Sequence, residues 1–91
     1  MKFQLIGVNH NTAPVEVRER LAIPESRLPE ACKKLGAHPG IEEGMILSTC
    51  NRVEVIAHSK NGSVDLRGFL RDYFQIDPNE FEKHLYEYRE Q

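Results

Sequence analysis

The sequence predicts an α+β domain of the ferredoxin-like kind, a βαββαβ sandwich whose four-stranded antiparallel sheet carries its helices on one face. Two apolar runs rich in β-branched residues, 44–50 and 52–59, follow one another almost without a gap, which is typical of a β-hairpin. Segments with helical spacing of apolar residues lie on both sides of this hairpin, and strand-like segments stand at both ends of the chain. The order is therefore β-α-β-β-α-β.

The first predicted strand spans 3–8, where alternating side chains face opposite sides of the sheet. The polar sequence NHNTAP at 9–14 ends this strand. Thr12 can cap the turn that follows, and Pro14 is tolerated in a first helical turn. The next segment offers three apolar side chains to the core, those of Val15, Leu21 and Ile23.

The clearest helix is predicted at 24–36, with Gly36 as its natural stop. Apolar residues at i, i+4 and i+7 share one face of this helix, which assigns Leu28, Cys32 and Leu35 to the core. The loop at 37–40 follows, and we expect its His38 to lie at the surface without partners.

The second hairpin strand has two distinct faces, one with Val53, Val55 and Ala57 and the other with Glu54, Ile56 and His58. We expect His58 to be exposed and an Asn-Gly turn to follow at 60–63. A second helix is predicted from the helical spacing of Leu66, Phe69, Leu70, Tyr73 and Phe74. A short helical turn at 77–84 and a last strand at 85–91 complete the domain.

This topology places several polar residues at one edge of the sheet. In the spatial strand order 4-1-3-2, the first and second strands run in the same direction, so they end where the third and fourth begin. The residues expected to converge there are Asn9, His10, Asn11, Ser48, Thr49, Cys50, Asn51 and Arg52, with His84 nearby.

The candidate chemistry at this edge is that of a thiol beside a guanidinium. A thiol is a nucleophile only as thiolate, which a nearby cation such as Arg52 favours over the neutral form. The planar fork of Arg52 also suits a carboxylate, and Thr49 and Asn51 can hydrogen-bond a substrate. The set predicts a nucleophile, Cys50, beside a carboxylate receptor, with His10 and Ser48 at the edge of the site.

Simpler interpretations of the same residues remain open. Cys50 could be a small buried apolar residue, which is the interpretation we adopt for Cys32. His10 is better explained by a turn than by catalysis, and His84 by a solvated helix end. The two cysteines and four histidines show no zinc spacing, and neither a G-x-G-x-x-G sequence nor a P-loop indicates a nucleotide site in this chain.

The composition fits a single small domain whose cysteine thiols are reduced. The 91 residues allow a single domain, and a net charge of −2 gives no general attraction for nucleic acid. A local basic patch could still contact RNA, although a solvated helix face explains it better: Arg18, Arg20, Arg27, Lys33 and Lys34. No apolar run reaches the roughly 20 residues of a membrane span, and no signal peptide is visible. We expect free thiols and a cytoplasmic location.

Two stretches, GVNHNTAPVEVRERLAI at 7–23 and EEGMILSTCNRVEV at 42–55, strongly resemble the start of the glutamyl-tRNA reductase family in order and in spacing. The resemblance implies that Cys50 is the catalytic nucleophile and that Thr49, Asn51 and Arg52 bind the glutamyl group. It implies thiolate attack on the ester of glutamyl-tRNA, then reduction of the thioester by NADPH. The product would be glutamate-1-semialdehyde, in the first step toward 5-aminolevulinate, tetrapyrroles and heme.

The resemblance also implies that more protein is needed for the full reaction. Family members are several times longer, so 1–91 is expected to be the N-terminal part of the catalytic domain. NADPH-binding and dimerisation domains, a homodimer and channelling to glutamate-1-semialdehyde aminotransferase are expected of the longer protein. The chain by itself is expected to lack the full activity and to need no metal.

Three rival classes are compatible with a ferredoxin-like fold. An acylphosphatase would carry a phosphate-binding arginine in the loop after the first strand, and NHNTAP has none. An RNA-recognition module would display aromatic residues on its central strands, where Phe3 stands alone. A purely structural or regulatory domain predicts an inert Cys50.

Overall fold

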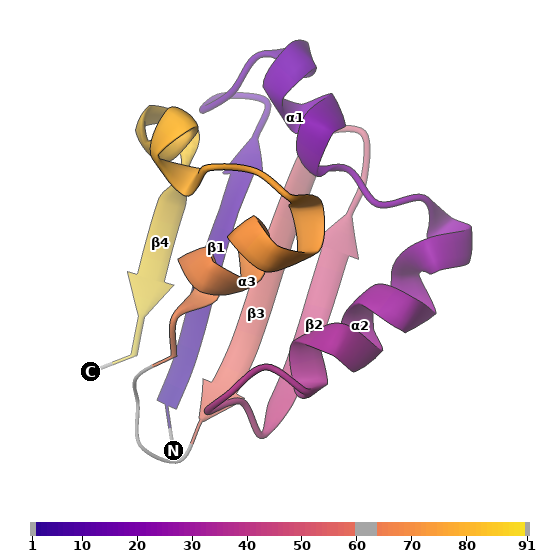
Figure 1. Cartoon of the computed structure of the whole chain (residues 1–91). Coiled ribbons are helices and arrows are strands. Elements are labelled where there is room, and N and C mark those ends of the chain that lie inside the picture. Colours follow the sequence, from indigo (N-terminus) through magenta and orange to yellow (C-terminus); the bar gives the residue numbers. More distant parts are fainter. Residues whose placement is uncertain (1, 60–63, 91) are drawn as a thin grey trace.

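The computed structural model describes residues 2–59 and 64–90, and it confirms the predicted α+β fold. Figure 1 shows the elements in chain order: β1 (Lys2–Asn9), α1 (Val15–Leu21), α2 (Leu28–Gly36), β2 (Glu43–Ser48), β3 (Arg52–Ser59), α3 (Leu66–Phe74) and β4 (Tyr86–Arg89). Short 3₁₀ turns at Glu25–Arg27, Pro78–Glu80 and Glu82–His84 precede α2 and β4. The predicted Asn-Gly turn at 60–63 lies outside the described residues.

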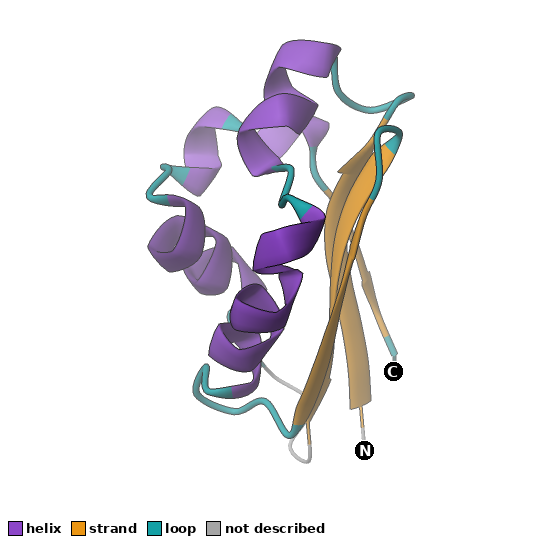
Figure 2. Ribbon diagram, turned by 90° about the vertical axis from the view of Figure 1, so that its right-hand side faces the viewer, coloured by secondary structure: helices purple, strands orange, loops and turns teal. Residues whose placement is uncertain are grey.

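The four strands form one sheet in the predicted order, β2-β3-β1-β4, with every neighbouring pair antiparallel. Figure 2 shows the helices stacked on one side of this sheet and none on the other. The long central pair, β1 with β3, runs from Lys2 opposite Ser59 to Asn9 opposite Arg52.

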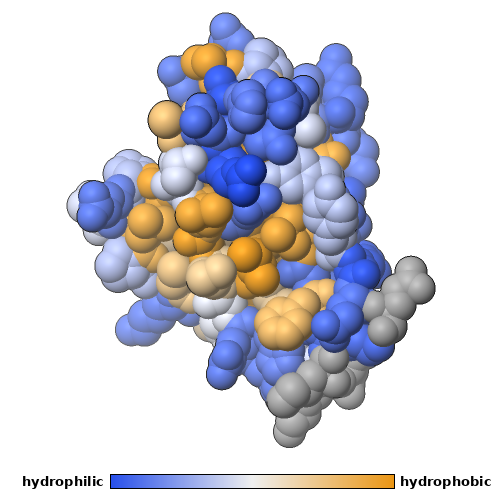
Figure 3. Space-filling model, turned by 180° about the vertical axis from the view of Figure 1, so that it is seen from behind, coloured by the Kyte–Doolittle hydropathy of each residue, from blue (hydrophilic) through white to orange (hydrophobic). Residues whose placement is uncertain are grey.

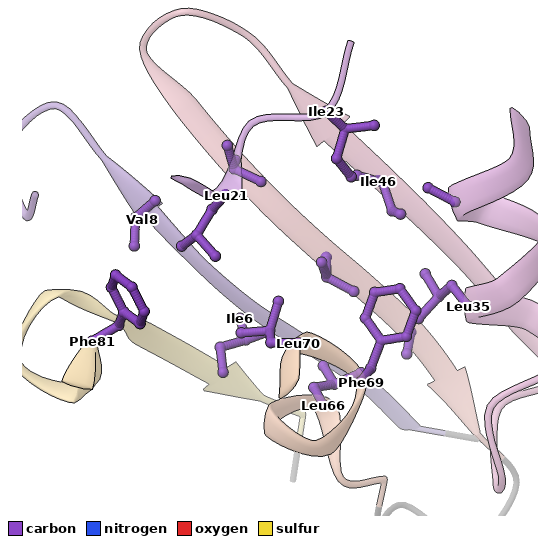
Figure 4. Close-up of a cluster of buried hydrophobic side chains, with 14 of the residues drawn as sticks. Ile6, Val8, Leu21, Ile23, Leu35, Ile46, Leu66, Phe69, Leu70 and Phe81 are labelled. Carbon is purple, nitrogen blue, oxygen red and sulfur yellow. The ribbon is translucent and has the colours of Figure 1, made fainter. Parts of the chain in front are cut away.

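The core lies between the sheet and its helices. Alternation along the central strands points Ile6, Val8, Val53, Val55 and Ala57 toward the helices, and all five side chains are buried. The helices complete the cluster in Figure 4 with Leu21, Leu35, Leu66, Phe69 and Leu70. Each such burial contributes about 1.5–3 kcal/mol, so this one cluster accounts for most of the stabilisation of a small domain.

The contact between α2 and β2 depends on a glycine. A Cβ atom added to Gly44 would lie 2.5 Å from a methyl carbon of Leu35, so only glycine lets this helix approach so closely. Ala31 and Leu35 are fully buried on the inner face of α2. The prediction for Leu28 and Cys32 was therefore only partly right, because both are half-buried at the edge of that face.

Two expectations for the segment after β1 were wrong. Val15 is 50% exposed, because it opens α1 above the sheet edge instead of over the core. Thr12 does not cap a helix, since its hydroxyl oxygen accepts a hydrogen bond from the Asn9 N–H at 2.9 Å. The Asn9 side chain accepts in turn from the N–H groups of Asn11 and Thr12, which fixes the loop as an Asx turn.

Two histidines are more enclosed than expected. His58 is buried, with its ring 4.8 Å from that of Phe3 and its Nδ1 3.8 Å from a carboxylate oxygen of Glu42. His38 does have partners, because its Nε2 lies 3.0 Å from the Asp65 carbonyl oxygen and its ring meets the edge of Phe69. Both contacts come from segments distant in sequence, which a local pattern does not reveal.

The helix-free face of the sheet is apolar over much of its area, as the orange surface in Figure 3 shows. Its exposed large side chains are those of Phe3, Met45, Leu47 and Tyr88. One polar row crosses this face close to the end of the sheet where β2 turns into β3. In this row Tyr86 on β4, Gly7 on β1 and Glu54 on β3 are neighbours in register.

This row depends on Gly7 at its centre, because glycine has no side chain. The Tyr86 hydroxyl reaches over Gly7 and donates to a Glu54 carboxylate oxygen at 2.6 Å. A Cβ atom on residue 7 would lie 2.5 Å from the Val53 carbonyl oxygen and 2.9 Å from Glu54 Cγ. Gly7 therefore allows β4 to be tied to β3 across the strand between them.

Gln4 provides a first test of the fold. Its buried amide donates to the Val64 carbonyl at 3.1 Å and accepts from the Val64 N–H at 2.8 Å, which holds the start of the α3 segment against β1. We expect Gln4→Leu to lower the free energy of unfolding by about 2–4 kcal/mol, because it leaves two buried backbone groups unpaired. Urea unfolding measures this change.

The matched control is Gln75→Leu, which removes an exposed side-chain hydrogen bond to Asp72. Its effect should stay within about 0.5 kcal/mol of zero. Equal effects of the two substitutions would contradict the structural role assigned to Gln4.

Tyr86 provides a second test. Burial, followed by the hydrogen bond to Glu54, raises the pKa of Tyr86 to about 12. Because the phenolate is disfavoured in the folded state, the stabilisation from Tyr86 is present below its unfolded pKa of about 10 and is lost as pH rises toward 12. An ultraviolet absorbance titration should show one tyrosine that titrates with a pKa of about 12, and Tyr86→Phe should remove this component. A titration whose high-pH component survives in Tyr86→Phe would refute the assignment.

Candidate active site

The predicted convergence of polar residues at one sheet edge is confirmed for the β1 and hairpin residues. Asn9 lies opposite Arg52 at the end of the central strand pair. The hairpin closes through the Thr49 N–H, which donates to the Arg52 carbonyl at 2.8 Å. The Thr49 hydroxyl oxygen accepts from the N–H groups of Asn51 and Arg52, both at 3.2 Å, and so shapes a tight turn. Cys50 and Asn51 form the tip of that turn.

Cys50 is exposed at the tip of the hairpin, whereas Cys32 is half-buried and packs against the core from α2. The alternative interpretation of Cys50 as a small buried apolar residue is therefore wrong. Asn51 is also exposed beside it. A solvent-accessible thiol at a sheet edge can be reached by an external electrophile, which is the first requirement for a nucleophile.

Arg52 lies on the helix-free side of the sheet, since its neighbour Val53 points into the core. Its Nη1 is 3.7 Å from a Glu54 carboxylate oxygen, and its side chain remains 47% exposed. Glu54 is itself held by the Tyr86 hydroxyl. The row across Gly7 therefore positions Arg52 loosely while leaving most of its fork open to a ligand carboxylate.

A pocket of about 260 Å³ lies on the other side of the hairpin tip, against α1. It is lined by Val15, Arg18, Glu19, Ala22, Thr49 and Cys50. The sequence interpretation placed Arg18 in a solvated basic patch and missed this position. Arg18 lies three residues after Val15 and four residues before Ala22, which directly follows α1. This helical spacing is the signal that could have placed Arg18 on the pocket face.

The remaining members of the predicted patch behave as ordinary surface cations. Arg20 pairs with Glu80 at 4.0 Å and lies over the Phe81 ring. Arg27 and Lys34 both approach Glu30, at 3.9 and 3.7 Å. Three of these four cations thus have an acidic partner at the surface, and the fourth, Lys33, is exposed on α2.

Other predicted residues at this edge have structural partners. The Ser48 hydroxyl oxygen accepts from the Ile23 N–H at 3.1 Å, which ties the segment after α1 to the end of β2. His84 Nδ1 lies 3.0 Å from the Thr12 carbonyl oxygen, so His84 does reach the loop after β1. His10 is exposed on that loop.

Residues 2–59 and 64–90 contain no group of three or more histidine, cysteine, aspartate or glutamate side chains placed to hold a metal ion. In the same ranges, no helix is long and apolar enough to cross a membrane. The functional groups present at this edge include the Cys50 thiol, the guanidinium groups of Arg18 and Arg52 and the polar side chains of the hairpin tip.

Comparison with known proteins agrees with the motifs at this edge. The most similar relatives include glutamyl-tRNA reductase 2 of Koribacter versatilis, 68% identical over 89 residues, which cover 98% of this chain and 20% of the relative. The glutamyl-tRNA reductase of Syntrophotalea carbinolica is 44% identical over 94% of the chain and 20% of the relative. That of Prochlorococcus marinus MIT 9515 is 42% identical over all of the chain and 22% of the relative.

The chain spans about a fifth of the length of these curated relatives. Residues 6–91 match the family described as the N-terminal domain of glutamyl-tRNA(Glu) reductase, a match that includes the second half of β1, the hairpin and β4. The chain therefore belongs to the glutamyl-tRNA reductase N-terminal domain family.

Proposed function

We propose that this chain carries the nucleophile of a glutamyl-tRNA reductase and that Cys50 is that nucleophile. The observation that carries the proposal is the exposed thiol at the hairpin tip, with Arg52 two residues away and open to a ligand. Family membership supports it, since the hairpin lies inside the matched region. The second cysteine, half-buried on α2, has no comparable access.

In the proposed reaction the Cys50 thiolate attacks the carbonyl carbon of the glutamyl ester. A sulfur–carbon bond forms, and the ester bond to the terminal ribose breaks. The ribose hydroxyl recovers a proton, and free tRNA leaves a thioester on Cys50. Reduction of that thioester by hydride releases glutamate-1-semialdehyde and regenerates the thiolate, which would begin tetrapyrrole synthesis.

The neighbouring residues have distinct proposed roles. Arg52 binds the side-chain carboxylate of the glutamyl group, since its guanidinium is only loosely engaged by Glu54. The Thr49 hydroxyl oxygen accepts two backbone hydrogen bonds, and its proton makes only a long 3.5 Å contact to the Arg52 carbonyl, which it could exchange for a substrate oxygen. Asn51 offers an exposed amide at the tip for the same ligand.

The described residues do not fit NADPH. The sheet is antiparallel throughout, so it has no switch point between parallel strands at which a dinucleotide binds. The loop between β1 and α1 has no glycine for close approach of a pyrophosphate. We propose that hydride from NADPH is supplied by a part of the complete enzyme outside these residues, in a cytoplasmic homodimer that passes its aldehyde to glutamate-1-semialdehyde aminotransferase.

Alkylation distinguishes a catalytic thiol from an inert one. We expect iodoacetamide to modify Cys50 at least about tenfold faster than Cys32, because the Cys50 thiol is exposed at the hairpin tip whereas Cys32 is half-buried against the core. Mass mapping of each site across a pH series measures both rates. Equal rates at the two cysteines would contradict the proposed environment of Cys50.

The same assignment can be tested by activity in a hybrid reductase, in which this chain replaces the matching segment of the Koribacter versatilis relative. Cys50→Ser should abolish thioester formation and semialdehyde release, because a hydroxyl without a strong base is a poor nucleophile. Cys32→Ser is the matched control and should retain activity. Semialdehyde production by Cys50→Ser would overturn the proposed function.

Arg52 can be tested in the same hybrid. We expect Arg52→Lys to lower kcat/KM for glutamyl-tRNA by about 10- to 100-fold, because a point charge cannot replace a two-pronged contact to a carboxylate. The matched control is Arg27→Lys, because the Arg27 side chain is 62% exposed in a surface ion pair. An effect no larger than that of the control would remove Arg52 from the carboxylate site.

A further inference from the structure

The guanidinium of Arg18 is unusual in this structure because part of it is buried without a partner. Its Nε and Nη1 atoms are shielded from solvent, and neither has a hydrogen-bond acceptor among the described residues. Buried N–H groups of a charged side chain are expensive to leave unpaired. In contrast, Arg52 and Arg67 each face a carboxylate. Arg18 therefore has donor capacity that only a ligand or another segment could satisfy.

The position of Arg18 indicates a ligand of the same reaction. Arg18 and Cys50 line one pocket, and Thr49 forms part of the wall between them. Arg52 lies on the opposite face of the sheet, because it alternates with the inward-facing Val53. The exposed thiol thus lies between two arginines that approach it from different sides of the sheet edge.

This arrangement matches the two parts of an aminoacyl ester. The carbonyl carbon that Cys50 attacks carries the glutamyl group on one side and the terminal ribose of tRNA on the other. That ribose is joined through its 5′ oxygen to the nearest phosphodiester of the tRNA chain. If Arg52 binds the glutamyl carboxylate, the opposite pocket is left for the ribose and its phosphate.

We propose that Arg18 binds the phosphodiester nearest to the 3′ end of glutamyl-tRNA, in the pocket between α1 and the hairpin tip. The inference rests on the proposed function of Cys50. An arginine fork suits a phosphate, and Arg18 lines this pocket with two nitrogens that have no acceptor among the described residues. Arg18 is in this sense a binding residue for the leaving group, and it holds the ester against the thiol.

The rest of the pocket fits a sugar phosphate better than a free anion. Glu19 also lines it, and its carboxylate would repel a small diffusing anion while accepting a hydrogen bond from a ribose hydroxyl. Val15 and Ala22 supply apolar walls for a ribose or base. Binding therefore requires the combination of phosphate and nucleoside.

The test uses cytidylyl-(3′→5′)-adenosine, which has the last phosphodiester of a tRNA end, with adenosine plus cytidine as the phosphate-free control. Each is added to the 91-residue chain while iodoacetamide labelling of Cys50 is followed. We expect the dinucleotide to slow labelling and the nucleosides to have little effect. Arg18→Gln should weaken this protection by about tenfold or more, as loss of a charged hydrogen bond predicts, and Arg18→Lys should restore part of it.

Two further variants separate the possible explanations. Ala22→Leu fills the pocket from an exposed position without altering Arg18, and it should also abolish protection. Arg52→Gln lies on the other face and should leave the ratio of protected to unprotected rates unchanged. Arg18→Gln should not lower the midpoint of thermal unfolding, because its two buried donors have no partner to lose.

Absence of dinucleotide protection, or equal protection in Arg18→Gln, would overturn the inference. So would protection that the nucleosides reproduce, because the phosphate would then have no part in binding. These outcomes can be distinguished from a failure of the proposed function of Cys50. If Cys50→Ser inactivates the hybrid reductase while Arg18→Gln leaves protection intact, only the role of Arg18 fails.

Discussion

The pairing of β1 with β3 is the constraint on which the rest of this structure depends. It extends from Lys2 opposite Ser59 to Asn9 opposite Arg52, and both other strands attach to it. This register determines which side chains enter the core and which face the helix-free side. It also aligns the end of β1 with the hairpin tip, so that a shift of one residue would bury Arg52 and expose Val53. The position of the candidate site is therefore a consequence of strand register.

Much of this arrangement follows from the sequence, because its strongest signals are local and periodic. The short connection between 44–50 and 52–59 allows little except a hairpin, and α3 has regularly spaced apolar residues. Once the strand order is known, convergence of Asn9 with Cys50 and Arg52 follows from geometry. The details that were missed depend on partners far apart in sequence. His58 is covered by Phe3 from the neighbouring strand β1, and Ala31 occupies the inner face of α2 that was assigned to Cys32.

Arg18 shows why charged residues are hardest to place from sequence. A helix pattern assigns an arginine to solvent because its head group is strongly hydrated, and only the helical spacing of Arg18 from Val15 and Ala22 distinguishes it from Arg20. The structure separates them, since Arg20 pairs with Glu80 at the surface whereas Arg18 turns into a pocket beside the thiol. The sequence predicted the nucleophile through its motif. It did not predict that Arg18 lines the pocket beside Cys50, because this position depends on how α1 packs above the hairpin.

In a domain this small, the unpaired nitrogens of Arg18 are costly enough to favour a ligand at this position. A domain of this length has a folding free energy of about 5–15 kcal/mol, and each buried polar group left unpaired costs about 1–3 kcal/mol. Two unpaired nitrogens on one side chain are then a large fraction of the total, whereas an apolar side chain such as methionine would avoid the cost. Such a cost is typical of functional sites, where local rules are broken for binding. The exposed Cys50 and the loosely held Arg52 at the same sheet edge fit that explanation, since neither contributes to the core.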